Sequence, residues 1–217
     1  MKKIFLMVIF CLMTYGQACT QSKPIMGYDR VAWGASVNDV RRAYNLGNNI
    51  VLEENYEDSS DIAALEQKNV SDGILSRTFL FNKWKGNYQL YRVWVYYKDA
   101  SDNTAQNLQN LLVNTYGNIT NTDKNEYIRN GLPYNQRISV FGKYSPELDV
   151  ELFRGTQTLI LTSSGSVYTG EITADFIDRI FMGITAEPYY LGEQKDLSVC
   201  YTWTRFRNEY RARGLSL

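Results

Sequence analysis

The chain has 217 residues, 23 of them basic and 23 acidic, and it contains no histidine. The lack of histidine excludes Ser-His-Asp and Cys-His catalysis and His-ligated metal sites, and the balanced charge gives no attraction for nucleic acid. Carboxylate, lysine and tyrosine chemistry stay open, but no spacing marks an acid–base pair. We therefore expect no enzymatic activity, no cofactor, no metal and no nucleic-acid partner.

Residues 1–18 have the layout of a secretory signal peptide. Two lysines precede an apolar run over 4–13, and the small residues Gly16 and Ala18 stand at −3 and −1 of a cleavage site before Cys19. The apolar run is too short for a permanent membrane span. We expect an exported protein, located in the periplasm or anchored to a membrane as a lipoprotein.

Cys19 has two interpretations that the sequence leaves open. In the first it is the lipidated N-terminal residue of a lipoprotein, and this lipid is the protein's single membrane attachment. In the second it is unmodified, and is free or paired with Cys200 in an oxidising compartment. Residues 19–27 are expected to form a tether, 28–204 a single domain with a subdivision near 120–135 as an alternative, and 205–217 a basic tail.

The folded part is expected to begin near Tyr28, with a short strand over 31–33. A helix follows, because Ser36 and Asp39 have the spacing of a capping box, and Gly47 ends it. A short strand over 50–52 then leads into a polar loop. The loop carries five carboxylates, which we interpret as a solvated loop rather than a calcium site because the spacing and glycine of a calcium loop are absent. These carboxylates are Glu53, Glu54, Glu57, Asp58 and Asp61.

The clearest β signal is a hairpin over 74–84 and 88–98 around the turn Lys85-Gly86-Asn87. Its return strand has apolar or aromatic residues on both faces, which predicts an interior strand. Simple alternation places Tyr88, Trp94 and Tyr96 on one face. Because aromatic rings stack on sugars and contact protein partners, we take these three residues as the candidate binding face, with a sheet core as the alternative.

A second helix is predicted from Ser101 or Asp102 to Gly117. After a polar loop, strands are expected over 137–141, 148–153, 159–162 and 197–203, and a short helix over 173–182. Residues 155–156 and 163–166 are expected to separate the strands. The buried stripe of the second helix comprises Ala105, Leu108, Leu111, Leu112 and Tyr116. The fold class predicted is α+β, an antiparallel sheet with two main packed helices.

The basic C-terminal segment carries Arg205, Arg207, Arg211 and Arg213. We interpret this cluster as solvated rather than as a contact with anionic lipid.

Three features together resemble a loose class of uncharacterised exported or lipoprotein α+β proteins of Gram-negative and spirochaete-type bacteria. They are Trp33-Gly34-x-Ser36 followed by Val40, the strand over 90–97, and Tyr116-Gly117. The resemblance covers about half of the chain and implies no catalytic residue. A remoter similarity, to small envelope lipoproteins that scaffold outer-membrane machinery, rests on the helix-plus-hairpin pattern.

Three functions follow from these patterns. The first is a non-enzymatic envelope protein that acts by binding a protein partner. The alternative is a periplasmic sugar- or lipid-binding protein that uses the aromatic sheet face or a cleft. A cleft walled by Tyr and Trp with convergent polar groups would favour this alternative, and a flat aromatic patch would favour the first. A hydrolase would need two carboxylates within about 10 Å in one cleft.

Overall fold

The computed structural model describes residues 27–46, 62–68, 70, 73–142 and 147–204. These residues contain nine strands and three helices, joined by turns and loops. The helices are α1 (Val37–Ala43), α2 (Asp102–Tyr116) and α3 (Ala174–Phe181). The strands are β1 (Gly27–Tyr28), β2 (Val31–Ala32), β3 (Ile62–Lys68), β4 (Ile74–Trp84), β5 (Asn87–Tyr97), β6 (Ile119–Arg129), β7 (Leu132–Phe141), β8 (Leu148–Thr162) and β9 (Tyr189–Trp203).

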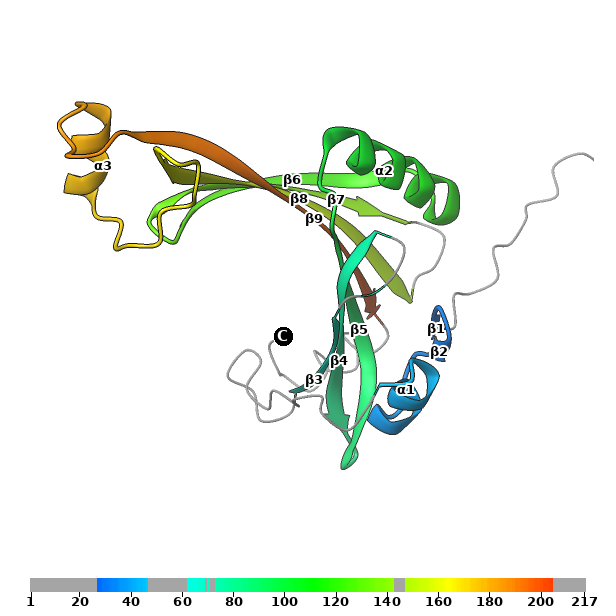
Figure 1. Ribbon diagram of the computed structural model, residues 1–217. Coiled ribbons are helices and arrows are strands. Elements are labelled where there is room, and N and C mark those ends of the chain that lie inside the picture. Colours follow the sequence, from blue (N-terminus) through cyan, green and yellow to red (C-terminus); the bar gives the residue numbers. More distant parts are fainter. Residues whose placement is uncertain (1–26, 47–61, 69, 71–72, 143–146, 205–217) are drawn as a thin grey trace, which may run out of the picture.

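Seven of these strands form one antiparallel sheet in the order β3-β4-β5-β9-β8-β7-β6. The long strand β9 joins two parts of the sheet. Its residues 198–202 pair with β5, whereas its whole length pairs with β8. Figure 1 shows the result as two arms that meet at a bend, one built from β3, β4 and β5 and the other from β6 to β9.

The predicted α+β class with two main packed helices is wrong, because strands make up 54% of the described residues and helices 20%. The helices α1 and α2 do not form a packed pair. Helix α1 contacts β2 and β5, while α2 contacts β7 and β8. Each helix therefore covers its own arm of the sheet, on the same side of the bend (Figure 1).

The local signals at the two predicted helices are confirmed. Ser36 and Asp39 form the capping box of α1, and α2 begins after Ser101 and ends at Gly117, whose φ of 93° favours glycine. The predicted stripe of α2 is wrong at Leu111, which is 59% exposed. Ala105, Leu108 and Leu112 are buried against the sheet.

The β4–β5 hairpin is also confirmed, and β5 is an interior strand as predicted. Two other predictions are wrong. The polar loop expected after α2 is the strand β6 and the start of β7, joined by Asn130-Gly131 with φ values of 54° and 77°. The break predicted at Gly155 is absent, because this residue lies inside the continuous strand β8.

Most of the core lies on one face of the sheet, which we call the helix face because α1 and α2 pack against it. Val40 of α1 and Leu112 of α2 share one cluster with sheet residues such as Phe79, Val95 and Leu152. A smaller cluster lies on the opposite face and is made by Ile62, Ala64, Leu80 and Tyr91. The bend of the sheet leaves this second face concave.

Several sequence predictions lie outside the described residues. They are the signal peptide, Cys19, the strand over 50–52, the acidic loop over 53–61 and the basic tail over 205–217. The region near 120–135, where a subdivision was an alternative, is part of the β6–β7 hairpin of the one sheet. Within the described ranges, no helix has both the length and the apolar character needed to cross a membrane.

Candidate functional site

A β-bulge in β5 separates the three aromatic residues that simple alternation placed together. Phe81 pairs with Leu90 and Leu80 pairs with Arg92, so Tyr91 is the extra residue. The residues before the bulge therefore face the opposite side from the expected one. Tyr88 packs against the helix-face core, while Tyr96 stacks on Trp94 on the concave face.

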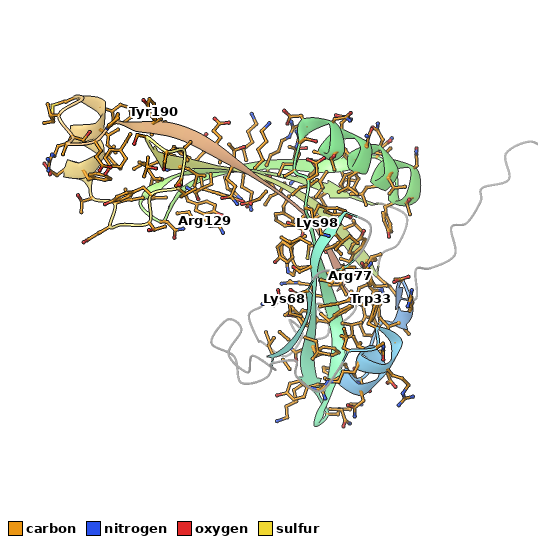
Figure 2. All side chains as sticks on the ribbon, in the orientation of Figure 1. Trp33, Lys68, Arg77, Lys98, Arg129 and Tyr190 are labelled. Atoms are coloured by element: carbon orange, nitrogen blue, oxygen red, sulfur yellow. The ribbon has the colours of Figure 1, made fainter. Side chains whose placement is uncertain are left out.

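The concave face contains a hollow of about 460 Å³ at the bend between the two arms. Figure 2 shows Arg129 on the lower side of the β6–β9 arm and Lys98 at the bend. The residues that line the hollow belong to the six strands β4 to β9, apart from Lys98, which directly follows β5. They are Leu75, Trp94, Tyr96, Tyr97, Lys98, Tyr127, Arg129, Tyr134, Gln136, Phe153, Gly155, Gln194, Lys195, Asp196, Leu197 and Ser198. Its volume is within the range of small-molecule binding sites, about 300–1,000 Å³.

The floor of the hollow is an aromatic platform from two strands that β9 separates. The rings of Trp94 and Tyr96 stack with 6.1 Å between centroids and 15° between planes. Phe153 of β8 lies 4.8 Å from Trp94. All three side chains are half-buried, so part of each ring faces the hollow.

A second aromatic pair forms the wall on the β6–β7 side. Tyr127 and Tyr134 face each other across the hairpin with 4.9 Å between ring centroids. Tyr134 is 4% exposed, and its ring lies over Gly155. An added Cβ at Gly155 would lie 2.5 Å from Tyr134 Cζ and would overlap the phenol oxygen. The glycine therefore makes room for the ring, and that is why it stands inside a strand.

Charged groups stand beside this aromatic wall. Arg129 Nη1 donates to Asp196 Oδ2 at 3.2 Å, and the guanidinium lies 5.1 Å from the centre of the Tyr134 ring. The Gln157 amide donates to the backbone carbonyls of Arg129 and Leu132, which fixes the turn that carries the arginine. Both partners of the ion pair are partly exposed, so its contribution to stability is small. Their hydrogen-bonding groups are accessible to a ligand.

Burial raises the pKa of the Tyr134 phenol, and the negative charge of Asp196 adds to this rise. The phenol is a hydrogen-bond donor at neutral pH, as a tyrosine of ordinary pKa is, and the shift extends this protonated range to higher pH.

The sequence prediction found Trp94 and Tyr96 but missed Arg129, Tyr134 and Phe153. One signal for the missed strands was present. Asn130-Gly131 is the dipeptide most typical of a two-residue hairpin turn, and it predicts that the residues on either side pair with each other. That pairing alone would bring Tyr127 and Tyr134 together.

Chemical groups for catalysis are sparse in the hollow. Asp196 is the single carboxylate among the described residues that line it, so no carboxylate pair stands there. Nor do the described ranges contain a group of three or more Cys, Asp or Glu side chains placed to hold a metal ion. Cys200 is buried on the concave side of β9, with its sulfur 3.5 Å from Thr202 Oγ1. Its pairing with Cys19, one of the alternatives that the sequence leaves open, involves a residue outside the described ranges.

Several exposed apolar side chains lie at the far end of the β6–β9 arm, where Figure 2 labels Tyr190. We call this end the apolar tip. Its large side chains that are each about half exposed or more are Val167, Phe181, Met182, Ile184, Tyr190 and Leu191. Tyr190 and Leu191 are neighbours in β9 and point to opposite faces of the sheet. Between 167 and 191 the chain has four acidic residues and one basic residue, so the tip carries a net charge of −3.

No protein-family model, curated protein or solved structure matches this chain. Function must therefore be inferred from the geometry and chemistry of its own surfaces.

Proposed function

We propose that the protein is an exported, non-enzymatic carbohydrate-binding protein, and that the hollow is its binding site. The stacked pair Trp94 and Tyr96 carries this proposal, because together with Phe153 it offers a broad apolar platform within a concave surface. The C–H faces of a pyranose ring pack on such a platform. Arg129, Asp196 and Gln136 at the side supply donors and acceptors for its hydroxyl groups.

A sugar suits the hollow better than a lipid chain does. A site for an acyl chain is enclosed and apolar, because an unpaired polar group in contact with the chain loses its hydrogen bonds to water. Here Lys98, Arg129 and Asp196 line an open hollow. Export is supported by the signal-peptide layout of residues 1–18.

The test is binding of the purified protein to an array of immobilised neutral and charged oligosaccharides, followed by calorimetric titration with the best one. Tyr96→Ala should weaken binding by about tenfold or more, because it removes one of the two stacked rings of the platform. Tyr88→Ala is the matched control, since Tyr88 is a half-buried tyrosine of the same strand that packs on the helix face.

Two outcomes would contradict the proposal. One is that no saccharide on the array binds to the folded wild-type protein. The other is that Tyr88→Ala and Tyr96→Ala weaken binding equally, because the ligand would then not occupy the concave face.

The apolar tip favours a second function, binding of a protein partner. Large apolar side chains left exposed at one end of a molecule favour an interaction site there, and the negative charge of the tip suits a partner with an apolar surface bordered by Lys and Arg. A photo-crosslinking amino acid at Ile184 should give one saturable adduct in the native envelope, and the same group at Leu111 of α2 should not. Equal crosslinking from both exposed positions would contradict a specific partner.

A further inference from the structure

The outer edge of β6 is a long hydrogen-bonding edge to which no described strand is paired. The strand has eleven residues, ten of them exposed, whereas strands average about five to six residues. An exposed edge of this length is a template on which another strand can pair. The edge strand at the other side of the sheet, β3, has seven residues.

The register of the β6–β7 hairpin determines which residues of β6 face outward, that is, direct their backbone N–H and C=O groups away from β7. Arg129 and Leu132 flank the two-residue turn, so they exchange hydrogen bonds with each other. Hydrogen-bonded and non-bonded pairs alternate along an antiparallel ladder. Ile128 is thus in a non-bonded pair, and its partner Pro133 has no N–H to donate. Accordingly, the residues that direct their backbone N–H and C=O to the open edge are Thr122, Lys124, Glu126 and Ile128.

We propose that β6 pairs with β6 of a second copy of this chain, antiparallel and centred on Asn125. In this register Lys124 lies opposite Glu126 of the partner subunit, and Glu126 lies opposite Lys124 of the partner subunit. Both residues belong to the outward-facing set, so the backbone hydrogen bonds and the two ion pairs form together. Opposite charges that face each other across paired strands stabilise the pairing.

Neighbouring registers do not have this complementarity. Shifting the centre by half a residue places outward-facing residues opposite inward-facing ones, and the hydrogen bonds are lost. Centring the pair on Lys124 sets two lysines opposite each other, and centring it on Glu126 sets two glutamates opposite each other. Of the registers centred on Lys124, Asn125 and Glu126, the one on Asn125 alone sets opposite charges facing each other.

The pairing would join two sheets into one, and side chains that lie opposite each other point to the same face. Both concave faces would then open on the same side of the dimer, with Tyr127 and Arg129 of each hollow close to the shared edge. If the hollow binds a saccharide as proposed above, the dimer would be bivalent for an extended glycan.

Sedimentation velocity of the mature chain without ligand, over a wide range of protein concentration, tests the dimer directly. Wild type should sediment as a concentration-dependent dimer. Lys124→Glu or Glu126→Lys alone should weaken the dimer by about tenfold or more, since each creates two like-charged pairs. The double variant Lys124→Glu with Glu126→Lys restores opposite charges and should recover the dimer.

Circular dichroism of wild type, the two single variants and the double variant checks that all four are folded. Substitutions at exposed positions of this kind rarely affect folding. A monomeric wild type at every concentration would overturn the proposal. So would a dimer that both single variants leave unchanged, or a double variant no tighter than the single variants. None of these results depends on carbohydrate binding, so the dimer and the binding site can fail separately.

Discussion

Replacing Gly155 with alanine tests whether the hollow depends on the contact between this residue and Tyr134. Glycine within a strand normally costs roughly 0.5–1 kcal/mol relative to alanine, so alanine would stabilise an ordinary strand position. Here the new Cβ would lie 2.5 Å from Tyr134 Cζ, whereas ordinary contacts begin at 3.4 Å. The ring must move by more than about 1 Å, because the phenol oxygen would lie closer still. Such overpacking lies at the upper end of its usual cost of about 1–3 kcal/mol.

We therefore expect Gly155→Ala to lower the free energy of unfolding by about 2–3 kcal/mol, measured by urea denaturation. In a Tyr134→Leu background the same change should be neutral or stabilising, because leucine lacks the ring atoms that the new Cβ would meet. The coupling in this double-mutant cycle should reach about 2 kcal/mol or more. A Gly155→Ala protein at least as stable as wild type would refute the explanation that glycine stands inside β8 because it makes room for the Tyr134 ring.

Two further predictions concern α2. Leu112→Ala should lower the free energy of unfolding by about 2–5 kcal/mol, since Leu112 is 2% exposed. Leu111→Ala, one residue away and 59% exposed, should lower it by less than about 0.5 kcal/mol. Equal losses in urea denaturation would mean that the helix presents a different face to the sheet. Hydrogen bonding and charge from Lys195 hold the pKa of Asp102 below its usual 3.8, so the stabilisation is present above that pH and lost as pH falls through the lowered value. Asp102→Asn should thus lower Tm at neutral pH, and this loss should shrink as the pH falls below 3.8; a Tm loss that stays constant with falling pH would contradict this linkage.

The sequence predicted local elements well where short-range chemistry determines them. The capping box at Ser36, the glycine at the end of α2 and the β4–β5 turn each depend on contacts within a few residues, and each is present. Their arrangement was less predictable. Helices that lie on separate arms of one bent sheet carry the same apolar stripes as helices that pack on each other.

The candidate site was only partly predictable from the sequence. A bulge shifts the side-chain alternation by one residue, so Tyr88 was grouped with Trp94 although the two lie on opposite faces. No local signal reveals that bulge, because it is set by the pairing of β4 with β5. The strand β6 was also missed. Nearly all of its side chains are solvent-exposed, so the apolar alternation that marks a half-buried strand is absent.

The most direct test of the hollow as a carbohydrate site is a two-dimensional NMR titration that follows the tryptophan indole N–H signals, assigned by single substitutions, as neutral oligosaccharides are added. The account predicts that the Trp94 signal shifts with a saturable dependence on ligand concentration. Trp33, which is buried in the helix-face core, should keep its position. An unchanged Trp94 signal in the presence of a bound saccharide, or no binding by any saccharide, would contradict the assignment of the hollow.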